Sequence, residues 1–209
     1  EAMKEMASHG VRFLLDKMWD EEHGGFYWMV NRAGEPTNRQ KIGYGHSFAI
    51  YSLSEYTLAT GDPVGLEYAE KVFDLLQKYA VDTHYGGYWE FFAEDWSMMG
   101  PGAPGGDRKT LDVHMHLMEA FTTLYEASGK DIHRRKLKES IDILIYKIMD
   151  PATGTGIPQF WADWSVAPQI KFDIVWGWDR FQWARPRNAV SPSASWQSVW
   201  RCTGSHLDQ

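Results

Sequence analysis

Cysteine is almost absent, since Cys202 is the only one among 209 residues. A single cysteine cannot form a disulfide within the chain, nor can it build a thiolate metal site, which needs several such ligands. Disulfide-rich secreted scaffolds and zinc-finger folds are therefore excluded. A reducing, cytoplasmic setting is the expectation.

Positive charge and long apolar runs are also scarce. Lys and Arg number 21 against 28 Asp and Glu, a net charge of −7. Without any basic run, this balance excludes an extended nucleic-acid-binding surface, so no nucleic-acid partner is expected. No apolar run approaches the roughly 20 residues of a membrane span, and no signal-peptide pattern is visible, so no membrane association is expected.

Large aromatic side chains are abundant by contrast. The chain has 11 Trp, 10 Tyr and 10 Phe, and 44% of its residues are hydrophobic. This content is ample for one large core. Aromatic residues also line surfaces that bind flat, half-apolar ligands, but for most of them a packing role is the simpler interpretation.

Five segments have the apolar period of an α-helix, and they fall into two kinds. Three have one charged face and are expected on the outside, whereas two are apolar around most of their circumference and are expected inside. The outer ones are residues 1–18, 63–80 and 131–148, and the inner ones are 44–60 and 110–128. The long loops all join an outer helix to the next inner helix, so they gather at one end. This pattern predicts an all-α (α/α) toroid, with short β-hairpins in those loops and a ligand cavity beneath them.

The long loops repeat one motif. Residues 20–28 contain an acidic residue, a Gly-Gly pair and aromatic residues, and residues 82–90 restate this order, with a weaker third copy from Asp150. His23 and His84 precede the two Gly-Gly pairs, so we expect a repeated structural role for them. No His-x-x-x-His spacing supports a metal site, and none is expected. Recurrent tryptophans are expected to pack loop onto helix, with sugar stacking as the alternative, and they are Trp28, Trp89 and Trp161.

One line of polar side chains crosses the inner helix at residues 110–128. At 100° per residue, Asp112, His116 and Glu119 share one narrow line, while apolar residues cover the rest, so the helix is expected to be buried nearly all round. An unpaired buried charge costs several kcal/mol. These groups must therefore bond one another or line a wet cavity, and both interpretations remain open.

Three separated motifs resemble the N-acylglucosamine 2-epimerase family, with relatives of the cellobiose 2-epimerase and mannose epimerase or isomerase type most similar. They are the Gly-Gly-Phe-Tyr-Trp element, residues 43–55 and residues 112–120. The resemblance covers residues 1–181 and implies an incomplete (α/α)6 toroid, with about five of its twelve helices. Residues 182–209 lie outside it, and this Arg-, Ser- and Trp-rich tail is expected to be an out-of-frame end, with a long irregular loop as the alternative.

The resemblance also implies a reaction. Members move a proton at carbon 2 of a reducing sugar through a cis-enediolate, using two histidines and neither metal nor nucleotide. The expected function is therefore a sugar 2-epimerase or aldose-ketose isomerase that needs no cofactor and binds a mono- or disaccharide. The two catalytic histidines of the family have no counterpart here. The chain is thus expected to be inactive as a fragment, and to self-associate through an exposed apolar flank.

Four residues are expected to bind the sugar. The resemblance places His116 at the last position of an Asn-Thr-His-x-His motif that lines the sugar site, and Tyr44 at a substrate-contacting tyrosine. Asp112 replaces the motif's Asn, and an ionised carboxylate only accepts where an amide also donates. Glu119 completes the polar line. In contrast, His114 points away from this line and is expected to be a core histidine.

Two other functions remain open. A glycoside hydrolase on a similar toroid needs two carboxylates across a glycosidic bond, and Asp112 and Glu119 are the candidates, although both would lie on one side of a bound sugar. The second alternative is a non-catalytic fragment that binds sugar weakly or not at all.

Overall fold

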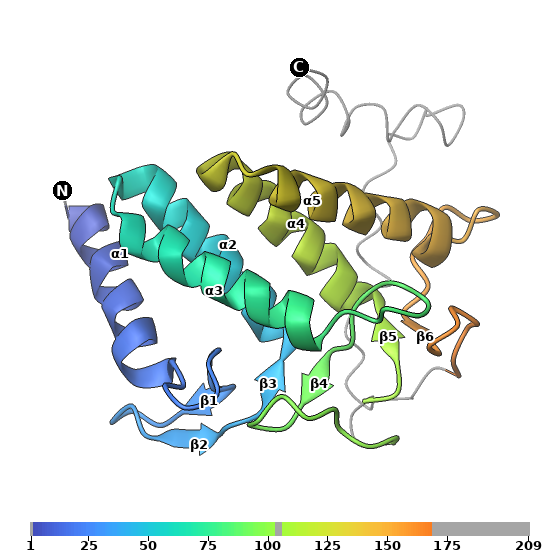
Figure 1. Cartoon of the computed structure of the whole chain (residues 1–209), viewed down its shortest axis with the longest axis horizontal. Helices are drawn as coiled ribbons and strands as arrows, with labels where there is room; N and C mark the ends of the chain where they lie inside the picture. The colour runs from blue at the N-terminus through green and yellow to red at the C-terminus, as the bar shows by residue number, and fades with distance from the viewer. Residues whose placement is uncertain (1, 103–105, 169–209) are drawn as a thin grey trace. The chain divides into compact units, whose positions relative to one another are not determined.

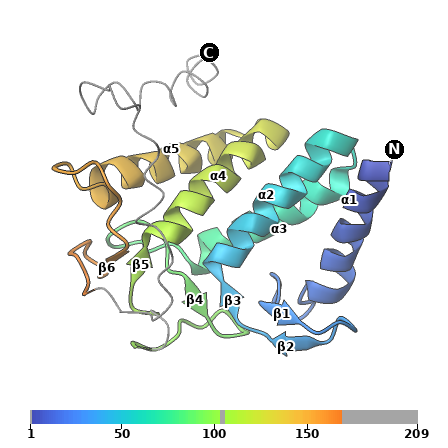
Figure 2. The ribbon, with the colours of Figure 1, turned by 180° about the vertical axis from the view of Figure 1, so that it is seen from behind.

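The computed structural model describes residues 2–102 and 106–168, which lie in one unit that ends at Pro168. Its five α-helices form two layers, with three outer helices and two inner ones (Figures 1 and 2). The outer helices are α1 (Ala2–Phe13), α3 (Pro63–Tyr79) and α5 (Asp131–Ile143), and the inner helices are α2 (Gly43–Thr60) and α4 (Leu111–Ser128). One turn of π-helix extends α1 and another extends α5, and these are η1 (Leu14–Met18) and η2 (Leu144–Ile148). The predicted order and layering of the helices are confirmed.

Short antiparallel strands lie at the end where the inner helices begin (Figure 1). The pairs are β1 (Met29–Val30) with β2 (Pro36–Asn38), β3 (Lys41–Ile42) with β4 (Phe91–Phe92), and β5 (Lys109–Thr110) with β6 (Gln159–Phe160). Only β1 and β2 form a hairpin within one loop. The other two pairs join the start of an inner helix to the following loop, so they connect successive copies of the repeat.

Capping residues determine where the helices start and stop. Thr110 caps the start of α4, because its hydroxyl accepts a hydrogen bond from the backbone N–H of Val113. Gly129 caps the end of α4 in the left-handed conformation, with φ 64°. Asp62 likewise accepts from the N–H of Val64 and stands directly before Pro63, which opens α3. These caps set where each helix starts and stops.

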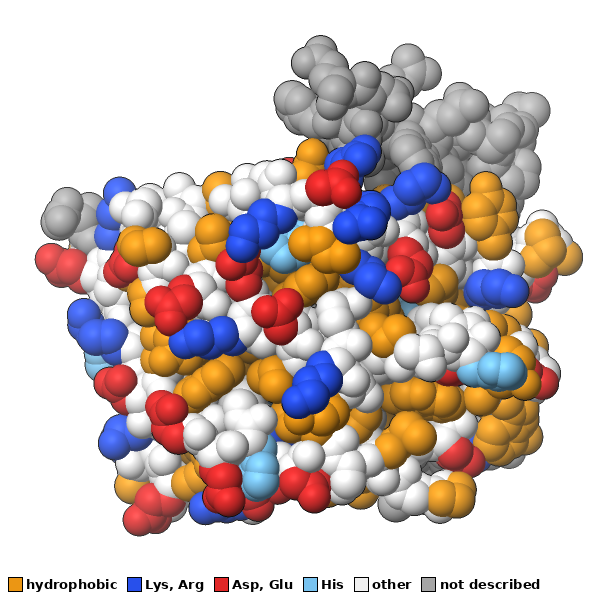
Figure 3. All heavy atoms as spheres, viewed as in Figure 1, with side chains coloured by type: hydrophobic (Ala, Val, Ile, Leu, Met, Phe, Trp, Pro, Cys, Tyr) orange, Lys and Arg blue, Asp and Glu red, His pale blue; other side chains and the backbone are white. Residues whose placement is uncertain are grey.

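The core lies between the two layers. Its fully buried side chains come from both inner helices and from α3, and they include Ile50, Leu53, Leu76, Leu117 and Leu124. The inner helix α2 packs against both α3 and α4, and α4 packs against α5. The outer face instead carries acidic and basic side chains of mixed sign, as Figure 3 shows. None of the described helices is long and apolar enough to cross a membrane.

One expectation about α4 is wrong, because the helix is not buried all round. Glu119 is exposed, and Asp112 and His116 are only half-buried. The same side of α2 exposes Phe48 and Tyr51. No described element covers this side of the inner layer, whereas helical periodicity shows only that a face is apolar. The expected boundary at residue 181 and the tail at 182–209 lie outside the described residues.

Candidate functional site

An aromatic cluster joins the first two turns of one inner helix to the second turn of the other. The ring of His116 on α4 lies 5.0 Å from that of Tyr44 and 4.7 Å from that of Phe48, both on α2, measured between ring centroids. Tyr44 and Phe48 are themselves 5.0 Å apart. The structure therefore brings Tyr44 and His116 together. Phe48 was missed, although its position one helical turn after Tyr44 could have indicated it.

The polar line on α4 is only partly bonded. His116 Nδ1 lies 2.8 Å from Glu119 Oε2. Because an ionised carboxylate only accepts, Nδ1 donates to Glu119, and Nε2 has no hydrogen-bond partner among the described residues. The carboxyl group of Asp112 forms no hydrogen bond with any described residue. Burial raises the pKa of Asp112, and the nearby His116 opposes this shift only in part.

Glu90 is a functional candidate that the sequence patterns did not reveal. It lies just before β4, its residue is 6% exposed, and its Oε2 accepts a 2.6 Å hydrogen bond from the hydroxyl of Thr110. Burial raises the pKa of Glu90 to about 7, an effect that the Thr110 bond opposes and Asp112 reinforces. The signal that could have found it is an acidic residue within the aromatic run at 88–92.

Three nearby carboxyl groups affect the pKa of the Tyr44 phenol. Burial is the largest cause of its raised pKa, and the negative charges of Asp112, Glu90 and Glu119 add to it. A phenol with a raised pKa stays protonated and remains a hydrogen-bond donor. The structure therefore gathers one set of groups at the start of α2 and α4, and we call it the mouth cluster: Tyr44, Phe48, Glu90, Asp112, His116 and Glu119.

Two other buried carboxylates have a different environment. Asp20 lies 2.7 Å from Lys41 Nζ, and Asp82 lies 2.7 Å from Lys109 Nζ, with both lysines fully buried. Burial alone would raise the pKa of Asp20, but the hydrogen bond from Lys41 and two backbone N–H groups hold it below its usual range. The same balance holds for Asp82. These carboxylates are structural ion pairs that anchor each loop to the start of an inner helix.

Two histidines complete this repeated anchor. His46 Nε2 accepts from the N–H of Phe26 at 3.0 Å, and His114 Nε2 accepts from the N–H of Tyr88 at 3.0 Å. In both cases Nδ1 lies within 2.8 Å of a backbone carbonyl, so Nδ1 bears the proton. Burial lowers the pKa of each to about 4, and both are neutral. His114 is thus a core histidine, as expected, and it packs against Tyr88 and Trp164.

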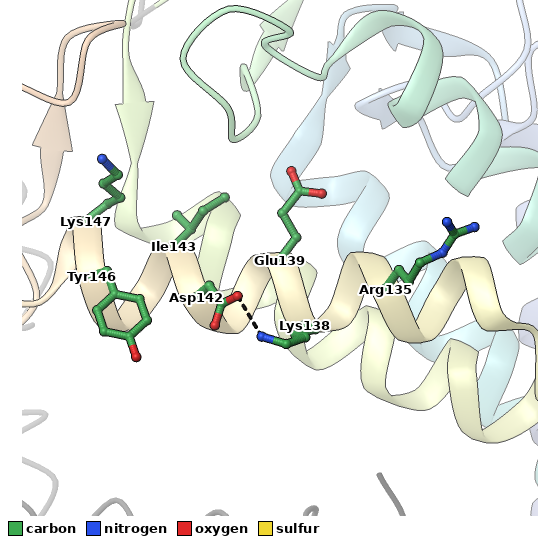
Figure 4. Close-up of a pocket in the computed structure, with 7 residues that line it drawn as sticks. All are labelled: Arg135, Lys138, Glu139, Asp142, Ile143, Tyr146 and Lys147. Carbon is green, nitrogen blue, oxygen red and sulfur yellow. Dashed lines mark hydrogen bonds and ion pairs between the residues drawn. The ribbon is translucent and has the colours of Figure 1, made fainter. Parts of the chain in front are cut away.

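A hollow of about 400 Å³ lies along α5 and η2, and it includes no residue of the mouth cluster (Figure 4). Its lining residues are Arg135, Lys138, Glu139, Asp142, Ile143, Tyr146 and Lys147. Charged side chains there pair along the helix, as Lys138 does with Asp142 at 3.0 Å. Arg135 and Glu139 also have ion-pair partners, Asp131 and Lys136. Within residues 2–102 and 106–168, no group of three or more His, Cys, Asp or Glu is arranged to hold a metal ion.

Comparison with known proteins places this geometry in context. A cellobiose 2-epimerase from Bacteroides fragilis is 36% identical over 179 residues, which cover 84% of this chain and 45% of that protein. A D-mannose isomerase from Thermobifida fusca is 22% identical over 168 residues, covering 80% of this chain and 40% of the isomerase. The solved cellobiose 2-epimerase of Spirochaeta thermophila superimposes with a TM-score of 0.70 at 35% identity, covering 78% of this chain and 41% of that one.

This chain therefore spans less than half the length of the relatives it matches. Its helices form part of an (α/α)6 toroid, the fold that these structural neighbours share. The sequence profile of N-acylglucosamine 2-epimerase (GlcNAc 2-epimerase) matches residues 1–186. With nearly the whole chain matched, this protein belongs to the N-acylglucosamine 2-epimerase family.

Proposed function

We propose that this chain is part of a sugar 2-epimerase or aldose-ketose isomerase that acts at carbon 2 of a reducing mono- or disaccharide. The observation that carries this proposal is the contact between Tyr44 and His116, at 5.0 Å between ring centroids, at the loop-bearing end of both inner helices. Family membership supports the reaction class.

The described residues supply binding and orientation in this proposal. Glu119 bonds to Nδ1 of His116, which leaves Nε2 available for a hydrogen bond with a sugar hydroxyl. The rings of Tyr44 and Phe48 offer an apolar surface to the C–H face of a pyranose, and the Tyr44 hydroxyl adds a donor. Asp112 is the fourth group, with a carboxyl that no described residue binds.

Proton transfer at carbon 2 requires a base and an acid within hydrogen-bond reach of the reacting proton. We assign neither role to a described residue, because His116 is committed to orienting a hydroxyl and His114 is buried with both nitrogens bonded. The 209-residue chain alone is therefore expected to bind sugar without turning it over. We propose no metal or cofactor.

The same proposal extends to partners and location. A net charge of −7 disfavours nucleic acid, which leaves the sugar as the expected partner. A lone cysteine is typical of a reducing compartment, so we propose a cytoplasmic enzyme.

A glycoside hydrolase is the alternative, and the position of its candidate carboxylates disfavours it. Hydrolysis needs two carboxyls about 5 to 9.5 Å apart on either side of a glycosidic bond. Asp112 and Glu119 come from one helix and would approach a sugar from the same side. Glu90 adds a third carboxyl, but it is bonded to the start of that same helix.

Saturation-transfer NMR with cellobiose, mannose and N-acetylmannosamine tests sugar binding directly. We expect a saturable signal from the 209-residue chain that is lost in His116→Ala. His84→Ala is the matched control, because His84 lies in a loop outside the mouth cluster. Binding that survives unchanged in His116→Ala would contradict the assigned sugar site.

The same mixtures in D2O distinguish the reaction classes. We expect no deuterium at carbon 2 with the 209-residue chain, and incorporation in a parallel sample that contains the cellobiose 2-epimerase of Bacteroides fragilis as the positive control. Time-dependent deuterium that scales with the amount of the chain would overturn the binding-only role. Glucose released from cellobiose would favour the hydrolase.

A further inference from the structure

We propose that Trp28 is a second platform of the sugar site, whose indole ring stacks on the non-reacting ring of a disaccharide while the mouth cluster holds the reducing ring. This inference rests on the proposed function, because it adds a binding residue to the same site and selects its substrate class. Trp28 lies directly before β1, at the end of the chain's loops where the inner helices begin (Figure 1).

The three recurrent tryptophans of the long loops have different surroundings. The ring of Trp161 carries the guanidinium of Arg108, with Cζ 4.7 Å from the ring centroid. The ring of Trp89 packs against the core, 5.2 Å from the buried ammonium of Lys109. Trp28 is 38% exposed, and among the described residues no aromatic ring or cation stacks on it and no acceptor binds its indole N–H. Its ring and its donor are therefore available to a ligand.

A glycine on α2 seats this indole. A Cβ at Gly45 would lie 2.9 Å from Cζ3 and 3.1 Å from Cε3 of Trp28, so any larger residue would displace the ring. The second copy of the repeat has Glu90 at the end of the loop motif and Val113 directly before its anchoring histidine. The indole and the glycine thus replace a smaller loop residue and a larger helix residue together. Glycine is a poor helix former, so close packing of the ring is the physical reason for it here.

Tyr44 stands between two glycines that face different neighbours. A Cβ at Gly43 would lie 2.9 Å from Cγ2 of Val113 on α4, whereas one at Gly45 would meet the Trp28 ring. Successive residues of a helix differ by 100° in direction, so Tyr44 points between these two neighbours. The Trp28 ring therefore lies on the side of Tyr44 that faces away from α4.

The mouth cluster occupies the other side of Tyr44. His116 of α4 contacts the rings of Tyr44 and Phe48, and it bonds to Glu119. The groups that can bond several hydroxyls therefore gather at α4, whereas the side of Trp28 offers a flat ring and a single N–H. Since the reaction at carbon 2 needs the reducing ring at the polar side, the side of Trp28 is left for a ring that does not react.

Stacking on an indole suits this second ring. A pyranose presents an apolar C–H face, and tryptophan combines a large apolar ring with one donor at its edge. Binding energy from a part of the substrate that does not react can be used to hold the reacting centre in place. A monosaccharide held by the mouth cluster has no second ring and gains nothing from Trp28. The site should therefore prefer a disaccharide.

Titrations with cellobiose and mannose, followed by saturation-transfer NMR, test this assignment in the 209-residue chain. We expect cellobiose to bind more tightly than mannose, and Trp28→Ala to weaken cellobiose roughly three- to tenfold while mannose binding stays unchanged. Trp28→Phe keeps a flat ring and should keep most of the affinity, whereas Trp28→Leu should not. Trp161→Ala is the matched control, because Arg108 already covers that ring, and it should bind both sugars as wild type.

Gly45→Ala tests the seat of the ring without changing Trp28 itself. The added Cβ displaces the indole, so cellobiose binding should weaken as it does in Trp28→Ala. Combining the two changes should cause no further loss, because both act on the same contact. Urea unfolding should show that Gly45→Ala stays folded, since alanine is the better helix former. Losses that add in the double variant would show that Gly45 does not act through Trp28.

The outcomes separate this inference from the proposed function. Cellobiose affinity that is unchanged in Trp28→Ala but lost in His116→Ala overturns the platform and leaves the sugar site in place. Equal losses for cellobiose and mannose in Trp28→Ala would put the indole on the reducing ring and overturn the preference for a disaccharide. A wild-type chain that binds neither sugar overturns the proposed function and this inference with it.

Discussion

At the scale of single residues, two histidines on one turn of α4 have opposite environments. His114 is fully buried, and both of its ring nitrogens bond to backbone groups. His116 is bonded through Nδ1 alone and lies at the partly open side of the helix. Sequence proximity therefore says little about role, because successive helical residues differ by 100° in direction.

Replacing these two histidines by alanine should separate their roles. His114→Ala leaves the N–H of Tyr88 without its acceptor and opens a cavity, so we expect a loss of about 2 to 3 kcal/mol in the free energy of unfolding. His116→Ala removes a partly exposed pair and should cost about 0.5 kcal/mol or less. Urea unfolding followed by tryptophan fluorescence measures both. Equal losses would show that the helical phase is misassigned.

Protonation of the buried histidines should make stability depend on pH. His46 has a pKa of about 4 in the folded chain against an ordinary value of 6.5, so the unfolded state binds more protons between these values. The contribution of His46 is therefore complete above pH 6.5 and is lost as the pH falls towards 4. We expect the penalty of His46→Gln to be about 2 kcal/mol smaller at pH 5 than at pH 7.

Glu90→Gln provides a control of opposite sign for this measurement. The raised pKa of Glu90 means that the folded state binds the extra proton, and wild type gains stability as the pH falls through 7. The penalty of Glu90→Gln should thus be larger at pH 5 than at pH 7. Penalties that are independent of pH for both variants would contradict these protonation states.

At the scale of elements, the chain has two copies of a loop that is anchored to the start of an inner helix. Trp96 covers His46, and Trp164 covers His114, at 4.9 and 5.3 Å between ring centroids. Both tryptophans have positive φ, an uncommon conformation for a bulky side chain. An indole N–H donated to the preceding loop, as Trp164 donates to the carbonyl of Tyr85 at 2.9 Å, helps to stabilise this conformation.

The Gly-Gly pair of this anchor permits a matched test. A Cβ on Gly87 would lie 2.6 Å from the Trp164 ring and 2.7 Å from His114 Nε2, whereas one on Gly86 would meet nothing within 4 Å. Both glycines have positive φ, so Gly86→Ala should cost only the backbone strain of about 1 kcal/mol. Gly87→Ala should cost roughly 2 to 4 kcal/mol, because the clash adds to that strain. Thermal and urea unfolding compare the two. Similar losses would argue against the close packing of tryptophan and histidine at this corner.

At the scale of the whole molecule, one side of the inner layer has no described neighbour. On α2, Phe48, Tyr51 and Leu58 are 40%, 41% and 48% exposed. The chain also spans less than half the length of its relatives. An uncovered apolar helix face of this kind favours association.

We predict that the 209-residue chain self-associates through this face. Tyr51→Glu combined with Leu58→Glu should shift it towards monomer, since each change places a charge in the contact. Tyr146→Glu, at a 76% exposed position on η2, should leave association unchanged. Sedimentation velocity measures all three. A wild-type chain that sediments as a stable monomer would contradict the prediction.

Much of this architecture is local and could be predicted. Apolar periodicity and capping residues determined five helices, their order and their two layers. The meeting of Tyr44 and His116 could also be predicted, because both lie near the start of an inner helix and those starts share one end. Phe48 was missed although it lies one helical turn after Tyr44, and Glu90 was missed because its role depends on contacts that periodicity does not report.

The sequence by itself determined the helices, the repeated loops and the polar line on α4, because these follow from neighbours along the chain. Only the tertiary structure decided which carboxylates are neutralised. Asp20 and Asp82 meet lysines distant in sequence when their loops fold over the start of an inner helix, whereas the side chain of Glu90 has no ion-pair partner among the described residues and bonds to the hydroxyl of Thr110. The protonation of a buried carboxyl depends on such distances in space, which the order of residues does not specify.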